Sequence, residues 1–335
     1  MSVATELDEI DEVVEELRHA ERLLLITHEN PDGDALGSLL AMHEVLIALG
    51  KDSLMFMPEQ GFSLPHEYRD MSFELRVDAP PADVSERLIV FLDCGNIDRM
   101  PVDFVQRDGT RIVNIDHHHD NTRFGSVNLI VAEASSTAEI VFRLAKELGV
   151  ELTPRIAEAL YVGVVTDTGR FMYESTTSEA HRMAAELIEA GVDVHAIYRR
   201  LYEELPFRRL ALQARALARV ERHERGLLTL THVTREDFEA TGSTDTDSEG
   251  VIDRIRVVEG TAVAALVRDL LCSESGPQRR KVSLRSTDGR VDVSRIARRY
   301  GGGGHQRAAG FTTSCDLPAL VEGLRAEIRE QLPAA

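Results

Sequence analysis

The feature that most constrains the fold is a set of short, continuously apolar runs, at residues 22–26, 87–92 and 111–115. None of these runs alternates apolar with polar residues, so we expect strands that are buried on both faces, as in a parallel sheet. Apolar residues at helical spacing precede, separate or follow the runs, at residues 7–17, 35–49, 136–148 and 154–165. Strands that alternate with helices predict an α/β domain built on a doubly wound parallel sheet.

The pattern changes after Thr176, and the chain of 335 residues is long enough for a second domain. Helical segments rich in Ala, Leu and Arg run to about Val220, and Pro206 interrupts them. Strand-like pieces follow at residues 227–232, 262–268 and 281–285. We therefore predict a first domain over 1–185, a helical linker over 186–220 and a smaller α+β domain over 221–335. The acidic, turn-rich segment 241–249 is expected to be a solvated loop.

The composition is that of an ordinary globular protein, with 43% hydrophobic and 28% charged residues. No apolar run approaches the roughly 18–20 residues that a membrane span needs. The first ten residues are acidic and amphipathic, unlike a secretory signal. Three widely spaced cysteines predict neither a disulfide framework nor a zinc pattern. We expect a cytoplasmic protein with no membrane partner.

The formal net charge of −19 argues against a protein that grips long nucleic acid over its whole surface. Charge is uneven, however, because residues 279–307 carry nine Lys or Arg against two Asp, a net of +7. A basic segment on an acidic protein suits a small anionic ligand better than a long polyanion. For Arg298 and Arg299 we prefer the alternative that they are solvated residues on a helix face.

Each apolar run ends in a cluster of Asp and His residues, and a fourth cluster follows a helix, at residues 27–38, 93–96, 116–120 and 166–170. Ligands of open α/β sheets bind beyond the carboxyl ends of the strands. Taken singly, Asp32, Asp34 and Asp167 can each be turn or cap residues, and the three histidines can be an exposed turn. Together they indicate a metal site, because carboxylates crowded together repel one another and need a cation.

The ligand types indicate which metal the site would hold. Several carboxylates with one or two imidazoles and no thiolate favour Mn²⁺ or Mg²⁺ over zinc. Two ions are favoured over one, because there are more candidate ligands than one octahedral ion uses. Two ions roughly 3.5–4 Å apart can share a bridging hydroxide and clamp a phosphoryl group during in-line attack.

In this order, the clusters resemble those of the DHH phosphoesterase family. The resemblance rests on His28-Glu-Asn-Pro-Asp32-Gly-Asp34-Ala-Leu-Gly-Ser38, Asp93, Asp116-His117-His118 and Thr166-Asp167-Thr168-Gly169. The C-terminal DHHA1 domain of that family is recognisable in Gly301-Gly-Gly-Gly304-His305-Gln-Arg307-Ala-Ala-Gly310-Phe311. The resemblance covers nearly the whole chain. It implies a catalytic, metal-binding DHH domain over 1–185 and a substrate-binding DHHA1 domain over 221–335.

The resemblance also implies roles for the clustered residues. One metal ion would be held by His28, Asp32 and Asp93. The other would be held by Asp34, Asp93, His117 and Asp167, so that Asp93 bridges the two. His118 would face the reacting phosphate, and Asp116 would orient an imidazole. His119 lies outside the two-histidine motif and is interpreted as structural or solvent-facing, although a slip of one position among the three histidines stays open.

In the second domain, the resemblance assigns substrate binding to Arg285, Gly303, Gly304 and His305, with Arg307 as a weaker candidate. Glycines let a backbone approach phosphate oxygens closely, and a nearby His or Arg can bond them. The alternative for the four glycines is a flexible linker. We prefer a packed loop, because Tyr300 and Phe311 bracket the small residues.

Chain length helps to separate the chemistries of the superfamily. Exonucleases of the RecJ kind add an oligonucleotide-binding domain, and family II pyrophosphatases carry a different second domain. With these two classes set aside, the chain resembles NrnA-like enzymes. These are oligoribonucleases of the 3′–5′ exonuclease type that act on RNAs of two to five nucleotides. They are also 3′(2′),5′-bisphosphate nucleotidases that act on adenosine 3′,5′-bisphosphate (pAp). The resemblance thus implies a Mn²⁺-dependent phosphoesterase for short nucleotides, and suggests a homodimer.

Several alternatives stay open at this point. Relatives of the same architecture hydrolyse cyclic di-AMP or its linear product pApA, and the sequence does not rank these substrates against pAp and short RNA. It also does not separate Mn²⁺ from Mg²⁺ or Co²⁺. A different class of function is a catalytically inactive, metal-stabilised nucleotide-binding module. Such modules usually lose metal ligands, whereas every expected position is filled here.

Overall fold

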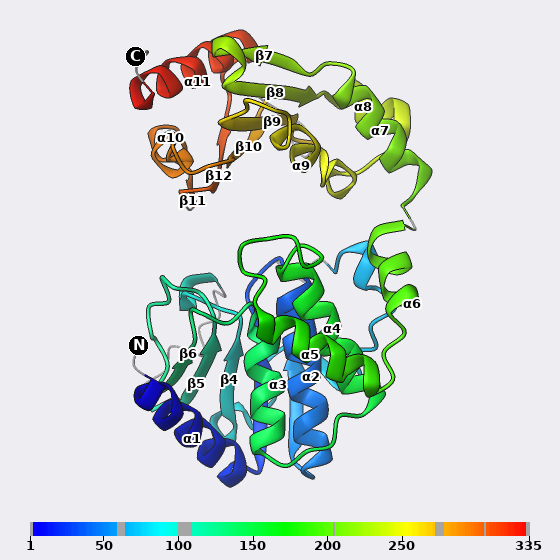
Figure 1. The fold of residues 1–335 in the computed structure, drawn as a ribbon, viewed down its shortest axis with the longest axis vertical. Helices are drawn as coiled ribbons and strands as arrows, with labels where there is room; N and C mark the ends of the chain where they lie inside the picture. Colours follow the sequence, from blue (N-terminus) through cyan, green and yellow to red (C-terminus); the bar gives the residue numbers. More distant parts are fainter. Residues whose placement is uncertain are drawn as a thin grey trace. The chain divides into compact units, whose positions relative to one another are not determined.

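A computed structural model describes residues 3–58, 64–99, 109–203, 205–271, 278–304 and 306–332. The chain forms two compact units, Met1–Glu204 and Leu205–Ala335 (Figure 1). The helices in the segment expected to be a linker divide between them, with α6 (Val194–Tyr198) in the first unit and α7 (Phe207–Leu217) in the second. Each unit has its own sheet and its own hydrophobic core.

The sheet of the first unit has six parallel strands in the order β3-β2-β1-β4-β5-β6. Their bounds are Arg22–Ile26 (β1), Asp52–Phe56 (β2), Arg76–Val77 (β3), Leu88–Leu92 (β4), Ile112–Asp116 (β5) and Val127–Ile130 (β6). The chain moves from β1 outward to β3 and then fills the other side with β4 to β6, which is the doubly wound order. The predicted parallel α/β sheet is therefore confirmed.

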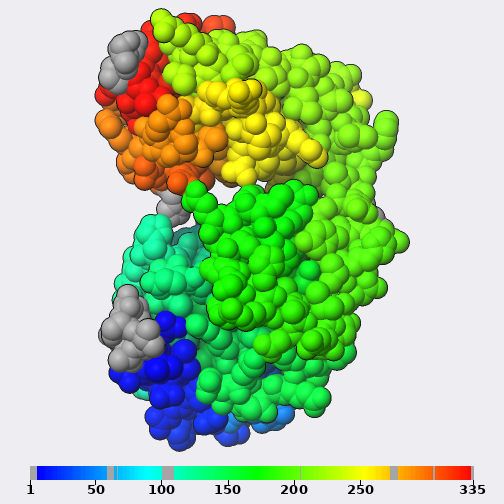
Figure 2. All heavy atoms as spheres, in the orientation of Figure 1, coloured from blue at the N-terminus to red at the C-terminus, as the bar shows by residue number. Residues whose placement is uncertain are grey.

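Five helices of eight or more residues belong to the first unit: α1 (Val3–His19), α2 (Gly33–Ala48), α3 (Thr137–Glu147), α4 (Pro154–Asp167) and α5 (Ser178–Glu189). One core joins their apolar residues to one face of the sheet. Residues 150–189, which include α4 and α5, form much of the surface of this unit that Figure 2 shows. On the other sheet face, Phe91 and its neighbours pack against Val84, Ile97 and Phe124 from connecting segments. Both faces of the central strands are thus buried.

Two glycines let α2 and α4 pack closely. A Cβ on Gly37 would lie 2.9 Å from the backbone nitrogen of Gly163, and would overlap the carbonyl oxygen of Ala159. A Cβ on Gly163 would lie 2.9 Å from Oδ1 of Asp34. Because Asp34 is in the first turn of α2 and Asp167 is the last residue of α4, this close packing brings two acidic residues together.

The second unit contains another six-stranded sheet, in the order β11-β12-β10-β9-β8-β7. Its strands are Glu221–His223 (β7), Leu228–Val233 (β8), Val263–Asp269 (β9), Arg280–Ser286 (β10), Gly303–Gly304 (β11) and Ala308–Thr313 (β12). All neighbours are antiparallel except β8 and β9. Helices α10 (Val293–Arg299) and α11 (Leu317–Gln331) pack on one face, and α7, α8 (Arg235–Thr241) and α9 (Val251–Arg256) on the other.

The structure corrects the expectation of a solvated loop over residues 241–249. Asp247 and Ser248 are buried, and residues Asp245–Ser248 form a short 3₁₀ helix. The Asp247 carboxylate accepts hydrogen bonds from the backbone nitrogen of Thr244 and from Nε of Arg208, both within 2.9 Å. The segment therefore ties α7 to the sheet of the second unit, because its acid caps a turn and pairs with an arginine.

Short helical turns complete the described structure: His66–Tyr68, Val84–Glu86, Ile97–Arg99 and Glu224–Gly226 are 3₁₀ helices, and Arg199–Glu203 is a π-helical turn. In the described residues, no helix is long and apolar enough to cross a membrane. Cys94 is a buried free thiol and Cys315 an exposed one, whereas Cys272 lies outside the described residues.

Candidate metal centre

The clustered acids and histidines meet at the carboxyl edge of the first sheet. His28 follows β1, Asp93 follows β4, and Asp116 ends β5. Asp32 caps the amino terminus of α2, where its Oδ1 accepts hydrogen bonds from the backbone nitrogens of Asp34 and Ala35 at 3.1 Å. The parallel sheet is what brings these positions together, because all its strands end at the same edge.

His28, Asp32 and Asp93 form one group of possible ligands, with one ligand atom of each within 4.8 Å of the others. Nδ1 of His28 lies 2.7 Å from the carbonyl oxygen of Glu29, so this nitrogen carries the proton and donates it. Nε2 is then left with a lone pair, and it lies 3.7 Å from Oδ2 of Asp93. The backbone contact thus orients the imidazole as a metal ligand requires.

A second group of possible ligands consists of Asp34, His117 and Asp167, and one ligand atom of each again lies within 4.8 Å of the others. Nε2 of His117 lies 3.9 Å from Oδ2 of Asp34, 3.7 Å from Oδ1 of Asp93 and 3.5 Å from Oδ2 of Asp167. Asp93 therefore turns one carboxylate oxygen toward His28 and the other toward His117. Its backbone is left-handed, with φ of 58°, an unfavourable conformation for a residue with a Cβ. Asp93 lies between the two groups.

His118 contacts Asp116 most closely and also approaches Asp93, one of the carboxylates around His117. Nδ1 of His118 lies 2.7 Å from Oδ1 of Asp116, and Nδ2 of Asn121 donates to Oδ2 of Asp116 at 2.6 Å. Burial lowers the pKa of His118, but the hydrogen bond to Asp116 and its charge outweigh burial and raise the pKa to about 9. Oδ1 of Asp93 is also within 3.6 Å of His118 Nδ1. His119 is exposed.

Burial and mutual repulsion act on the carboxylates of the site. Burial and then the charges of Asp93 and Asp167 raise the pKa of Asp34 well above its usual value. Burial likewise raises the pKa of Asp167 to about 7. Burial acts in the same sense on Asp93, but its contact with the His28 imidazole and the charges of His117 and His118 bring its pKa to about 2. In the described part of the chain, the ion-pair partners of these carboxylates are all histidines. A divalent cation fits this donor set of hard oxygens and imidazoles.

The amino terminus of α3 completes the site, and the sequence did not reveal its role. The backbone nitrogens of Thr137 and Ala138 donate to Oδ2 and Oδ1 of Asp34 at 2.6 and 2.9 Å. The Thr137 hydroxyl donates to Oδ1 of Asp93 at 3.1 Å. The Ser136-x-x-Glu139 spacing is a signal for a helix start. This spacing does not predict that the amino terminus of the helix would face Asp34.

Four of the residues expected to bind substrate lie on or beside three neighbouring strands of the second unit. Arg285 is on β10 and pairs with Ala308 of β12. Gly303 and Gly304 form β11 beside β12, and Arg307 directly precedes β12. Gly304 has φ of 131°, and a Cβ there would lie 2.6 Å from the carbonyl oxygen of Ala308, so only glycine fits. His305 lies outside the described residues.

Comparison with known proteins connects both units to one family. A model of the DHH family, N-terminal domain, matches residues 22–164, and a DHHA1 domain model matches residues 238–332. A bifunctional oligoribonuclease and PAP phosphatase NrnA from Thermus thermophilus is 36% identical over 325 residues, covering 93% of this chain and 91% of that protein. The chain belongs to the DHH family. Its second unit carries the DHHA1 domain.

Further DHH relatives agree along the whole chain. The bifunctional oligoribonuclease and PAP phosphatase NrnA of Bacillus subtilis is 26% identical over 305 residues, covering 89% of this chain and 91% of that protein. The crystal structure of an exopolyphosphatase-related protein from Bacteroides fragilis has a TM-score of 0.88 at 26% identity, covering 98% and 97% of the two chains. A structure of exonuclease RecJ bound to manganese shares the fold, with a TM-score of 0.59 at 17% identity, covering 98% and 95%.

Most of the basic segment in the DHHA1 unit is used in internal ion pairs. Five of its nine cations contact acids of the same unit: Arg280, Arg290, Arg295, Arg298 and Arg299. Arg299, for example, lies 2.5 Å from Glu327 and 2.8 Å from Glu330 of α11. The net charge of this segment therefore overstates what it offers to an anionic ligand.

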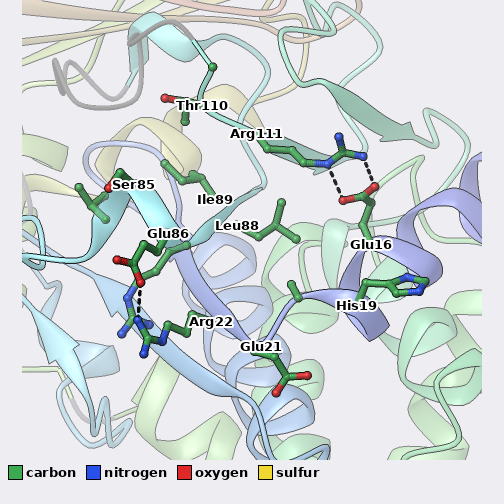
Figure 3. Close-up of a pocket in the computed structure, with 14 residues that line it drawn as sticks. Glu16, His19, Glu21, Arg22, Ser85, Glu86, Leu88, Ile89, Thr110 and Arg111 are labelled. Carbon is green, nitrogen blue, oxygen red and sulfur yellow. Dashed lines mark hydrogen bonds and ion pairs between the residues drawn. The ribbon is translucent and has the colours of Figure 1, made fainter.

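The DHH unit also contains a cavity of about 520 Å³, whose lining residues are drawn in Figure 3. It is lined by the end of α1, the starts of β1 and β4, and residues 109–111, at the amino edge of the sheet. Its charged groups satisfy one another: Arg111 pairs with Glu16, and Arg22 lies 2.7 Å from Glu86. No residue of the two ligand groups lines it. The metal centre is the stronger candidate site.

Proposed function

We propose that this protein is a Mn²⁺-dependent phosphoesterase that hydrolyses short nucleotide substrates, namely oligoribonucleotides of two to five nucleotides and pAp. The observation that carries the proposal is the position of Asp93, whose two carboxylate oxygens face two separate groups of ligands. Relatives that align along almost the entire chain are named as oligoribonucleases and PAP phosphatases, which supports this substrate class.

Two ions are proposed, with Mg²⁺ or Co²⁺ as possible substitutes for Mn²⁺. His28, Asp32 and Asp93 would hold one ion, and Asp34, Asp93, His117 and Asp167 would hold the other. When bound, the ions would neutralise the negative charge of the phosphate and lower the pKa of the attacking water. Because a carboxylate shared by both groups fixes their separation, Asp93 would set the spacing of the site.

His118 is proposed to act directly on the substrate. Asp116 binds its Nδ1, so Nε2 is the atom left to contact the phosphate or to protonate the leaving oxygen. Asn121 in turn holds the other oxygen of Asp116, which keeps the imidazole in one orientation. Asp116 is therefore proposed to be a positioning residue that acts through His118.

The DHHA1 unit is proposed to limit substrate length. Arg285, Gly303, Gly304, His305 and Arg307 would bind a second phosphate or a base of the substrate. Glycines without side-chain obstruction let backbone N–H groups approach phosphate oxygens, and an Arg guanidinium can bond two of them. No group lies within 4 Å of a Cβ built on Gly303, so its backbone is accessible.

The test is a panel of substrates offered to the purified protein with Mn²⁺: pAp, pApA, a five-nucleotide RNA, a 24-nucleotide RNA and cyclic di-AMP. We expect cleavage of the short substrates and little or none of the 24-nucleotide RNA. The relative kcat/KM values assign the physiological substrate, including the cyclic and linear di-adenylates. Equal rates on the five- and 24-nucleotide RNAs would contradict the length limit. A protein that binds Mn²⁺ and nucleotide without turnover would instead be a binding module.

A further inference from the structure

The loop after Asp167 has a backbone conformation that its sequence does not favour. Gly169, Arg170 and Phe171 are consecutive residues in the left-handed region, with φ of 56°, 64° and 61°. For Arg170 and Phe171 this conformation brings the Cβ close to the following carbonyl oxygen. Such residues stay left-handed only where surrounding contacts hold them, and they concentrate at functional sites.

Several contacts hold this loop. The buried Thr168 hydroxyl donates to the carbonyl oxygen of Val164 at 2.6 Å and accepts the N–H of Phe171 at 3.1 Å. The carbonyl oxygen of Thr168 accepts the N–H groups of Met172 and Tyr173, both at 3.0 Å. These bonds close a tight turn immediately after the end of α4.

The side chains of the two left-handed residues are anchored on the unit itself. The ring of Phe171 stacks on His181 of α5, with centroids 4.9 Å apart. The guanidinium of Arg170 lies over the ring of Tyr202, 5.0 Å from its centroid. Arg170 and Phe171 are therefore both held by contacts with other elements of the same unit, and the next two side chains, Met172 and Tyr173, are exposed.

Met172 and Tyr173 are 65% and 46% exposed, although both are largely apolar. One part of Tyr173 is covered, because a Cβ on Gly169 would overlap its ring, so the ring lies against the Gly169 backbone. Gly169 is two residues from the candidate ligand Asp167, which limits their Cα separation to at most about 7 Å. The aromatic ring is thus held against the loop that directly follows the candidate ligand Asp167.

We propose that Tyr173, with Met172 beside it, forms the surface on which the base next to the cleaved phosphate stacks. Every base has an aromatic face, so a fixed tyrosine binds bases without selecting a sequence, as an enzyme of short mixed RNAs requires. The polarisable thioether of Met172 adds an adaptable contact. This inference rests on the proposed function, and it names the base contact of that site.

The first test compares binding of AMP with binding of ribose 5-phosphate, which lacks the base, to the Mn²⁺-loaded protein by calorimetry. We expect AMP to bind about tenfold more tightly, as a single stacked base allows. Tyr173→Ala should remove this difference without changing the affinity for ribose 5-phosphate, and Tyr173→Phe should retain it. Phe207→Ala, which removes an exposed aromatic residue of the other unit, is the matched control and should change neither.

The second test measures pApA hydrolysis by the same variants. We expect Tyr173→Ala to raise KM about tenfold with kcat little changed, and Tyr173→Phe to resemble wild type. Thermal unfolding of each variant separates loss of folding from loss of binding.

If wild type cleaves pApA and Tyr173→Ala has the same KM, the stacking surface is wrong while the proposed function stands. If wild type cleaves none of pAp, pApA and the five-nucleotide RNA but its AMP binding depends on Tyr173, the proposed function fails and the stacking surface stands. Equal affinity of wild type for AMP and ribose 5-phosphate overturns the stacking surface.

Discussion

The Thr137 hydroxyl donates a hydrogen bond to Oδ1 of Asp93 over 3.1 Å, and both residues are almost fully buried. The backbone N–H of the same threonine bonds Oδ2 of Asp34. Thr137, at the start of α3, therefore holds two carboxylates. One belongs to Asp93, which lies between the two ligand groups, and the other belongs to Asp34 of the second group. A residue outside the recognised motifs thus fixes the spacing of the candidate ligands.

Replacing Thr137 by Val should weaken Mn²⁺ binding while leaving the fold intact, because the side chain keeps its shape and loses only its hydroxyl. Partners that orient ligands typically change metal affinity by about 10- to 100-fold. Calorimetric titration with Mn²⁺ measures the loss, and Thr137→Ser, which keeps the donor, should remain close to wild type. Unchanged affinity in the Val variant would show that the hydroxyl does not orient Asp93.

Asp93→Asn should eliminate turnover on every substrate that wild type cleaves, because the carboxylate that contacts both groups of ligands loses its negative charge and one of its two oxygens. The bound metal, measured by elemental analysis after dialysis, should also fall below the wild-type content. Asp98→Asn changes an exposed acid five residues further along and serves as the matched control. Near-wild-type activity of the Asp93 variant would contradict the proposed ligand assignment.

Arg285→Ala should act on substrate binding and leave the chemical step nearly unchanged. Loss of a charge-assisted hydrogen bond of about 1.5–3 kcal/mol corresponds to a rise in KM of roughly ten- to a hundredfold. Steady-state kinetics on pAp and on a five-nucleotide RNA measure this rise. Arg279→Ala removes an exposed arginine just before β10 and should have little effect. Equal effects of the two substitutions would mean that general charge, and not the position of Arg285, matters.

Gly163→Ala should destabilise the first unit, because the added Cβ would lie 2.5 Å from that of Ala138 and 2.9 Å from Oδ1 of Asp34. Overpacking of this kind costs about 1–3 kcal/mol of unfolding free energy. Chemical denaturation measures the loss, and Mn²⁺ affinity should fall as Asp34 is displaced. Adding Ala138→Gly removes one of the two clashes and should restore part of the stability. A Gly163→Ala protein as stable as wild type would refute close packing as the reason for this glycine.

His43 should make the protein less stable in mild acid. Burial, followed by the charge of Arg155, lowers its pKa to about 4, and its Nδ1 lies 2.9 Å from the Ser53 hydroxyl. The unfolded chain binds the proton at about pH 6.5, so unfolding free energy should fall as pH drops from 6.5 to 4, by about 3 kcal/mol at most. Denaturation of wild type and His43→Gln across this range isolates the contribution. Parallel pH profiles would contradict the lowered pKa.

The apolar runs predicted β1, β4 and β5, because the apolar residues of these strands face a core on one side of the sheet or the other. β2 and β6 were not predicted, since Asp52–Phe56 and Val127–Ile130 include polar residues that interrupt the apolar signal. Strand order follows from pairing between distant segments and is not encoded in any one of them. The parallel sheet could be predicted from its central strands β1, β4 and β5, whereas its outer strands could not be predicted.

The candidate ligands were predictable because each is an Asp or His directly after a strand or at a helix end. The supporting contacts were not predictable, because they come from ordinary residues. In the sequence, Gly37 and Gly163 are single glycines within predicted helices and do not predict a contact. In the structure they permit the close approach of α2 and α4. Arg280 belongs to the basic segment that was expected to suit an anionic ligand, yet its side chain pairs with Asp269. Which partner a common residue meets depends on the finished fold.

The candidate ligands extend from His28 to Asp167 along the chain and meet only when β1, β4, β5 and α4 are in place. No short stretch of the unfolded chain reproduces such a site, so the metal binds the native state selectively. A ligand of this kind adds to the unfolding free energy in proportion to the logarithm of its concentration, about 2.7 kcal/mol at a hundredfold excess over its dissociation constant. The supply of metal ions would then influence how long each molecule survives proteolysis, as well as how fast it works.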